Sequence, residues 1–256
     1  KGTFTIASTG VYTFTPVANW NGDIPQVTYT TNTGSSSTLD VKITPVNDAP
    51  TALNASLRTL EDTPLVLSSK DFNFTDPDGT TLSSVTITTL PLTGGTLQYK
   101  ADNGTWVPVT LNQVITAADI DAGRLQFAPT LNASGAASFG FKVSDGTLTS
   151  TLAYTTSIAI TPVDDASVLR ADTFATAEDL ISTGNVLTND SDVDSGVLSV
   201  TSFKIAGLDG TYAAGASVVL AGKGTFTIAS TGVYTFTPVA NWNRSEEHTS
   251  ELQSRV

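Results

Sequence analysis

The sequence predicts an all-β protein built from tandem β-sandwich modules in a linear array. Three observations support this fold class: short runs of alternating apolar and polar residues, turn residues between those runs, and a long segment that occurs twice. Alternation with a period of two places successive side chains on opposite faces of a strand. Strands that recur about every 8–12 residues, with Gly, Asp and Asn between them, favour a sandwich of about seven strands.

The repeated segment reads KGTFTIASTGVYTFTPVANWN and occupies both 1–21 and 223–243, so the period is 222 residues. Two unlike modules lie within that period. TPVNDAPT at 44–51 and TPVDDASV at 161–168 are equivalent junctions 117 residues apart, which leaves 105 residues for the other module. Repeats of this length predict an array of domains that fold independently.

We therefore expect four segments. Residues 1–46 are the C-terminal part of one sandwich, 47–163 form a complete sandwich, 164–243 are the N-terminal part of a second copy of the first, and 244–256 are a foreign tail. The tail, RSEEHTSELQSRV, holds three of the five Glu and the only His, and it resembles a translated sequencing-library adapter. The chain also opens without Met inside an alternating pattern, so we expect a piece of a longer protein.

Individual strands follow from the alternation. TFTIASTGVYTFTPV at 3–17 predicts a hairpin with a Ser-Thr-Gly turn. One helical turn is predicted for TAADIDAG at 116–123, with Thr116 as its N-cap and Gly123 as its end. The other alternating apolar positions are Leu39, Val41 and Ile43, then Phe139, Phe141 and Val143, then Ile158 and Ile160.

Composition excludes several classes of protein. The absence of Cys rules out disulfides, thiolate metal sites and cysteine nucleophiles. A net charge of −12 argues against nucleic-acid binding, because phosphates need Lys and Arg. No run of about 18 apolar residues occurs, so we expect no transmembrane segment in this stretch.

Acidic side chains gather at the junctions, and 19 of the 24 acidic residues are Asp. DPDGTTL at 76–82 and DVDSGVL at 192–198 both place Asp-x-Asp four residues before a Leu. A hard dication such as Ca²⁺ takes roughly six to eight oxygen ligands, and short Asp side chains on a loop can supply several of them. Asp is also an ordinary turn residue that caps its own backbone, so turn formation is the alternative at each single position.

The recurrence of the pattern favours calcium for the set. The candidate ligands at the first junction are Asn47, Asp48, Glu61, Asp76, Asp78 and Asp145. Those at the second junction are Asp164, Asp165, Glu178, Asp190, Asp192 and Asp194. Because His and Cys are absent before residue 244, zinc and copper are not expected.

PVNDAP, LEDTPL, FTDPDGTTLSSVTI and FKVSDGTLTSTLAYTTSIAITPVDDA resemble the cadherin-like tandem repeats of giant bacterial adhesins of the RTX type. NVLTNDSDVDSGVLSV and GTFTIASTGVYTFTPVANWNG are similar to the VCBS-type repeat of the same proteins, so the resemblance covers 1–243. It implies inter-module calcium held by an N-terminal Glu, a paired Asp loop, an Asp before the last strands and an Asn-Asp linker. These positions fall on Glu61, on Asp76 and Asp78, on Asp145, and on Asn47 with Asp48 or Asp164 with Asp165.

The sequence departs from that pattern in two places. The linkers carry fewer acids than the full motif, and Asn32 stands where the VCBS-type module is expected to have an Asp before its last strand. The number of calcium ions at each junction is therefore open.

The resemblance implies a calcium-stiffened structural spacer, the stalk of a secreted or surface-attached adhesin in cell adhesion or biofilm formation. Its partners would be neighbouring repeats of the same chain, with homophilic or polysaccharide contacts left open, and its location the bacterial surface or the extracellular space. The alternative is a carbohydrate-binding module that stacks sugars on Trp20, Trp106 or Trp242. We expect no enzyme, because the acids recur at module joints rather than around one cleft.

Residues 164–243 are followed by no counterpart of 22–46 in this sequence. We therefore expect this half-module to expose apolar edges, and either to leave that end disordered or to pair it between chains.

Overall fold

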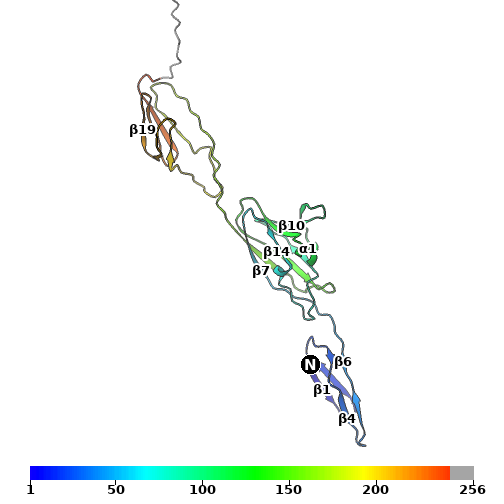
Figure 1. Ribbon diagram of the computed structural model, residues 1–256. Helices are drawn as coiled ribbons and strands as arrows, with labels where there is room; N and C mark the ends of the chain where they lie inside the picture. Colours follow the sequence, from blue (N-terminus) through cyan, green and yellow to red (C-terminus); the bar gives the residue numbers. More distant parts are fainter. Residues whose placement is uncertain (243–256) are drawn as a thin grey trace, which may run out of the picture. The chain divides into compact units, whose positions relative to one another are not determined.

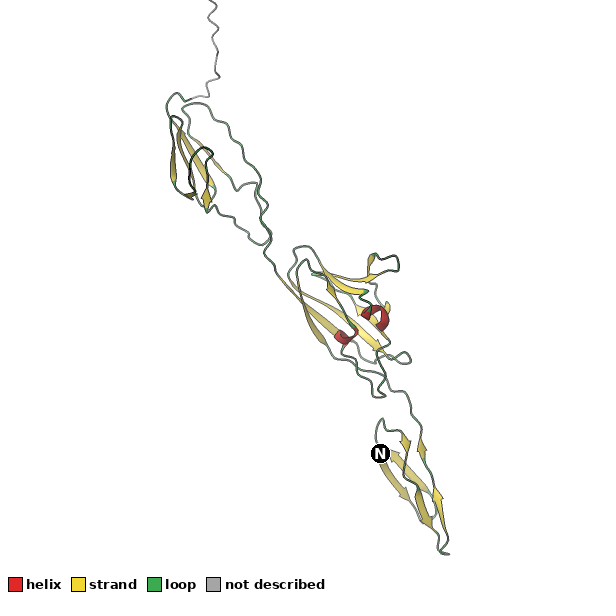
Figure 2. Ribbon diagram, viewed as in Figure 1, coloured by secondary structure: helices red, strands yellow, loops and turns green. Residues whose placement is uncertain are grey.

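The computed structural model describes residues 1–242, and its regular secondary structure is almost entirely β-strand (Figures 1 and 2). The predicted all-β, tandem β-sandwich fold is confirmed. The chain divides after Val163 into two compact units. Within the first unit, residues 1–46 and residues 47–163 form separate sheets.

Residues 1–46 form three two-stranded sheets. The predicted hairpin is present as β1 (Gly2–Ile6) and β2 (Tyr12–Pro16). The other two sheets pair β3 (Gly22–Asp23) with β6 (Lys42–Ile43), and β4 (Val27–Thr30) with β5 (Ser36–Leu39). No residue of this segment is fully buried.

Residues 47–163 contain a complete sandwich of a five-stranded and a four-stranded sheet, in the orders β12-β9-β14-β15-β7 and β11-β10-β13-β8. The elements are β7 (Ala55–Leu60), β8 (Leu65–Val66), the 3₁₀ helix η1 (Ser69–Phe72), β9 (Ser84–Thr89), β10 (Gly95–Lys100), β11 (Trp106–Pro108), β12 (Val114–Thr116), α1 (Ala117–Asp121), β13 (Leu125–Pro129), β14 (Gly135–Ser144) and β15 (Tyr154–Thr161).

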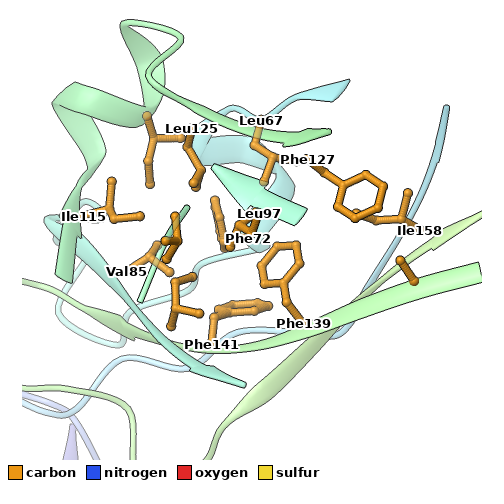
Figure 3. Packing of buried hydrophobic residues seen from close by; sticks show 14 of the residues in the cluster. Leu67, Phe72, Val85, Leu97, Ile115, Leu125, Phe127, Phe139, Phe141 and Ile158 are labelled. Atoms are coloured by element: carbon orange, nitrogen blue, oxygen red, sulfur yellow. The ribbon is translucent and has the colours of Figure 1, made fainter. Parts of the chain in front are cut away.

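The core of this sandwich is built by the alternating residues of its last two strands. Phe139, Phe141 and Ile158 are at most 1% exposed. The rings of Phe72 and Phe141 meet edge to face with their centroids 4.9 Å apart, and Figure 3 shows them beside Phe139. Burial of an aromatic ring with this geometry adds to the hydrophobic contribution of its area.

The last strand closes the sheet by pairing in parallel with the first. Thr156 to Thr161 of β15 lie opposite Ala55 to Leu60 of β7, with Ile158 beside Leu57. All other strand pairs in this sandwich are antiparallel. β7 has no other partner in the five-stranded sheet, so this sheet is complete only when β15 is in place.

The predicted helical turn is also present. Thr116 accepts a hydrogen bond from Asp119 N at 3.1 Å, as an N-cap does, and Gly123 follows α1 with a φ of 72°. A left-handed glycine just beyond a helix ends it at little steric cost.

The second unit contains a four-stranded sheet in the order β16-β21-β20-β19 and a two-stranded sheet. The strands are β16 (Ser182–Asn185), β17 (Ser202–Phe203), β18 (Tyr212–Ala213), β19 (Ser217–Leu220), β20 (Gly224–Ile228) and β21 (Val233–Pro238). Val218, Tyr234 and Phe236 are buried, whereas Phe174 is 49% exposed. The expected exposure of apolar residues in this unit is therefore confirmed.

One Gly–Pro pairing between antiparallel strands occurs in all three segments. Gly2 pairs with Pro16 and Gly224 with Pro238 in the two identical copies. A Cβ on Gly224 would collide with the carbonyl oxygen of Thr237, so the start of this strand requires glycine. The complete sandwich repeats the arrangement where β10 meets β13.

We predict that Phe141→Ala destabilises the complete sandwich by about 3–5 kcal/mol, because it empties part of a close-packed core. Thermal and denaturant unfolding of the full chain measure the change. Leu92→Ala is the matched control, since Leu92 is 98% exposed and should shift stability by less than about 0.5 kcal/mol. Equal effects of the two variants would contradict the assigned core.

Candidate metal centre

At the first junction the linker is tied to the Asp-x-Asp loop by backbone and carboxylate contacts. Thr51 and Thr75 form an isolated antiparallel bridge with two hydrogen bonds of 2.8 Å. Three residues earlier, Asp48 N donates to Asp78 Oδ2 at 2.7 Å. The linker therefore approaches the loop through a main-chain bridge, and one loop carboxylate holds it there.

Asp76 orders the same loop. Its Oδ1 accepts from Asp78 N at 2.8 Å and from Thr80 N at 3.4 Å, which is the Asx-turn role considered from the sequence. Its Oδ2 is buried and has no hydrogen-bond partner within residues 1–242. A buried, unsatisfied carboxylate oxygen is rare in folded proteins, and a bound ion is one of its ordinary explanations.

Asp145 joins the linker to the end of β14. Its Oδ2 accepts from Asn47 Nδ2 at 2.8 Å, and its Oδ1 accepts from Thr147 N at 2.6 Å and Leu148 N at 2.7 Å. The Asn47 amide, followed by the two backbone amides, holds the pKa of the Asp145 carboxyl below its usual value. Asp145 is therefore kept in the charged form that a cation prefers.

At the first junction hydrogen bonds link five of the six predicted ligands in two groups, Asn47 with Asp145, and Asp48 through Asp78 with Asp76. Their oxygens are carboxylate and amide oxygens, which are the donors that Ca²⁺ prefers. Turn formation and ion binding are compatible here, because the Asx hydrogen bonds use only one oxygen of Asp76.

Glu61, the sixth candidate, was assigned to the wrong end of its module. Its Oε1 accepts from Val163 N at 2.6 Å, and its own N–H donates to Thr161 O at 2.9 Å. β7 separates it from the first junction by six residues, about 20 Å of extended chain. Glu61 is only 3% exposed and lies directly beside the strand end that leads into the second linker. The resemblance gave the residue type, but only the parallel pairing of β7 and β15 shows which junction it faces.

The second junction repeats the network of the first within its own unit. Asp165 N donates to Asp194 Oδ2 at 2.6 Å, and Asp194 N donates to Asp192 Oδ1 at 2.9 Å. Val168 and Ser191 form the corresponding bridge. Two modules of different sequence thus place an Asp-x-Asp pair against their linkers in the same way.

The two networks differ at the second oxygen of the first Asp in each loop. Ser167 stands where the first linker has Pro50, and its hydroxyl donates to Asp192 Oδ2 at 2.6 Å. This contact is the largest contribution that lowers the pKa of Asp192, ahead of the amides of Ser195 and Asp194. Ser167 was not predicted as a functional residue, although the sequence shows Ser167 where the equivalent linker has Pro50.

The remaining candidates of the second junction are Asp190, Asp164 and Glu178. Asp190 accepts from Arg170 N at 2.7 Å and so supports the linker from a neighbouring position. Asp164 and Glu178 are exposed, and Glu178 follows residues 171–177, which form no strand. Whether any of these residues binds a metal stays a prediction.

We predict that Asp145→Asn weakens the chain near neutral pH and flattens its stability profile in acid. Because the folded-state pKa is depressed, the contribution of Asp145 is present above the unfolded Asp value of about 3.9 and is lost as pH falls through the lower folded value. Thermal unfolding across acid pH measures the profile. The control is Asp209→Asn in an exposed loop. An unchanged acid profile in Asp145→Asn would contradict the assigned hydrogen bonds.

Comparison with solved structures gives only distant similarity. An endo-fucoidan hydrolase of glycoside hydrolase family 107, MfFcnA4, aligns with 93% of this chain at 17% identity and a TM-score of 0.27. A variant of that enzyme aligns with a TM-score of 0.28. The chain spans 33% of the hydrolase's length, and this likeness supports no functional argument.

No curated protein matches the chain. Within residues 1–242 no helix has the length and apolar character needed to cross a membrane. The model of the bacterial Ig domain, Big_9, matches twice, at residues 47–157 and 164–252. The second match enters the tail predicted to be foreign, and that tail lies outside the described residues. The chain belongs to the bacterial Ig domain family, with two of these domains in tandem.

Proposed function

We propose that this chain is a structural spacer from the repetitive stalk of a secreted or surface-attached bacterial adhesin, with calcium bound at its module junctions. The assignment to a surface or extracellular protein rests on the family, because tandem bacterial Ig domains are typical of such proteins. The observation that carries the calcium part is the recurring Asp network, together with the buried, unpartnered Oδ2 of Asp76.

Electrostatics favours a cation in the first network. Two like charges 4 Å apart repel by about 1 kcal/mol in water and by about 4 kcal/mol in a surface-like dielectric. Asp48 N donates to Asp78, Asp78 N donates to Asp76, and Asn47 donates to Asp145, so these four acidic residues lie along one linker. Asp76, Asp78 and Asp145 would hold the ion, and Asp48 and Asn47 would support it from the linker.

The ion would act on the freedom of the linker. Residues 47 and 48 are already hydrogen-bonded to Asp145 and Asp78 of the sandwich that follows them. A cation that binds the same carboxylates would hold these contacts in place and so restrict the backbone that joins successive modules. Such stiffening suits a spacer whose partners are the neighbouring repeats of its own chain. We also propose that the modules are cadherin-like and VCBS-type repeats, and that the stalk serves cell adhesion or biofilm formation.

A carbohydrate-binding module is the second candidate, and Trp106 is the residue that favours it. Trp106 lies on β11 at the edge of the four-stranded sheet, half-buried, with Lys100 Nζ 5.7 Å from its ring centroid. Trp20 and Trp242 pack edge to face on Phe14 and Phe236, which gives them a role within the fold.

We predict that calcium stabilises the full chain and magnesium does not. For a dissociation constant of about 1 mM, 10 mM calcium adds about 1.4 kcal/mol, and for about 0.1 mM it adds about 2.7 kcal/mol. Thermal unfolding in chelator and then across a calcium series measures the shift.

Two matched variants assign the calcium effect to a junction. Asp76→Asn removes the unpartnered carboxylate oxygen and should abolish most of the calcium response. Asp192→Asn should remove less of it, because Ser167 already satisfies the equivalent oxygen. A melting temperature that does not change with calcium would show that these Asp residues form turns and do not bind calcium.

For the carbohydrate candidate, tryptophan fluorescence of the full chain should stay unchanged on addition of acidic and neutral polysaccharides. A saturable change that disappears in Trp106→Ala would favour sugar binding over the spacer role, whereas Trp20→Ala tests for a nonspecific effect.

A further inference from the structure

Part of β14 in the complete sandwich has a neighbouring strand on only one side. β14 pairs with β15 from Gly135 to Phe141, whereas its pairing with β9 covers only Gly140 to Ser144. Residues 135–139 therefore have no strand beside them on the β9 side within residues 1–242. An unpaired strand edge is a template on which another extended chain can form hydrogen bonds.

A β-bulge in β9 opens this edge. Gly140 lies opposite Thr89, whereas Phe141 lies opposite Ile87. Thr88 is therefore the extra residue, and β9 ends at Thr89 before the chain continues into β10 of the other sheet. A Cβ on Gly140 would lie 2.6 Å from Thr89 Oγ1 and 2.7 Å from Thr88 Oγ1, so a larger residue would displace both threonine side chains. The open edge is thus part of how the sandwich is built, since a bulge can end strand pairing.

The alternation along β14 shows which backbone groups face the open side. Ser144 O accepts from Ser83 N at 2.8 Å, beside the start of β9. Successive residues of an antiparallel strand direct their backbone groups to opposite sides, and the register with β15 is unbroken from 135 to 141. The even-numbered residues of β14 therefore point toward the β9 side. The N–H and C=O groups of Ala136 and Ser138 lie at the open edge.

This edge lacks the features that discourage edge-to-edge pairing. Natural sheets protect exposed edges with charged residues, with proline or with very short strands. Among the outer strands of this sandwich, β7 carries Arg58, β11 carries Pro108, and β8 and β12 have two and three residues. Residues 135–138 read GAAS, so their side chains are small and uncharged. Another backbone can therefore approach this edge closely.

An open groove of about 810 Å³ lies beside the edge. Its lining includes Ala136 and Ser138 of the edge, together with Leu90, Leu92 and Leu111 from the loops after β9 and β11. Among the described residues, none that lines the groove carries a charge, although the whole chain has a net charge of −12. Copies of an acidic chain repel one another, so an uncharged surface is where two of them can meet.

We propose that residues 135–139 of two copies of this chain pair edge to edge in antiparallel orientation, about a two-fold axis at Ala137. Ala136 of each copy then lies opposite Ser138 of the other. In this register every N–H and C=O group that Ala136 and Ser138 direct outward meets its complement on the second copy. The donor and acceptor pattern of the edge is its own electrostatic complement, as an isologous interface requires. This self-complementarity identifies the occupant of the edge as a second copy.

The leucines beside the edge add apolar contact to the backbone pairing. Leu92 is 98% exposed and Leu111 is 56% exposed. A strand in the groove covers part of both side chains, and burial of apolar surface favours association. Because the interface is small, we expect a weak dimer in exchange with monomers. The contact uses none of the linker carboxylates, so it is independent of the proposed calcium sites.

Light scattering of the full chain in the presence of a chelator tests the association. We expect the mass to rise from monomer toward dimer as the concentration increases to about 1 mM, where weak contacts become populated. Ser138→Lys places a charge on the edge and should keep the chain monomeric. Thr155→Lys adds the same charge at an exposed position of β15 outside the groove, so this variant should associate like the parent chain.

Cysteine cross-linking tests the register. The chain contains no Cys, so a single introduced Cys can form a disulfide only with another copy. Residues 136 and 138 of the two copies face each other in the proposed pairing, with Cβ atoms about 5 Å apart. An equimolar mixture of Ala136→Cys and Ser138→Cys should therefore form disulfide-linked dimers faster than either variant alone. A mixture of Thr155→Cys and Ser138→Cys is the matched control and should link slowly.

A parent chain that stays monomeric at about 1 mM would overturn the proposal. Association that Ser138→Lys leaves unchanged would also overturn it, because the contact would then lie elsewhere. The cross-linking variants replace small, exposed side chains, so they keep the proposal falsifiable even if Ser138→Lys fails to fold. Equal rates of disulfide formation in the test and control mixtures would contradict the proposed register and the contact itself.

Discussion

In the complete sandwich the last strand pairs in parallel with the first strand, and the closed core and the position of the next linker both result from this pairing. In the complete sandwich β15 lies between β14 and β7, so the sheet closes only when the chain returns to the strand with which it began. Ile158 and Ile160 then cover a core that Phe139 and Phe141 fill. β15 leads directly into the next linker. The strand pairing that completes the core therefore also fixes where this linker begins.

The parallel pairing of β7 with β15 also explains where the acidic residues lie. Glu61 ends β7 and accepts a hydrogen bond from Val163, so it faces the linker that leaves its module. Asp78 and Asp145 hold the linker that enters it. The complete sandwich therefore carries acidic groups at both ends, one set on the linker that enters it and Glu61 on the linker that leaves it.

Sequence alone predicted the fold class, the hairpin at 3–17, the capped turn at Thr116 and the relation between the two Asp-x-Asp loops, because these depend on local periodicity and turn chemistry. It placed Glu61 at the wrong junction because strand order is not a local property. It also missed Ser167, whose effect appears only when the linker lies against Asp192. The exposure of Phe174 in the second unit agrees with the apolar exposure expected from the repeat arithmetic.

The calcium ion that we propose would bind where the first linker meets the loop of Asp76. Amide NMR of the full chain during a calcium titration tests it most directly. The N–H groups of Asp48 and Asp78 donate to loop carboxylates, so they report on those carboxylates. We predict that both signals shift along one saturation curve with calcium, remain in place with magnesium, and remain in place with calcium in Asp76→Asn. Signals that do not respond to millimolar calcium would contradict the claim.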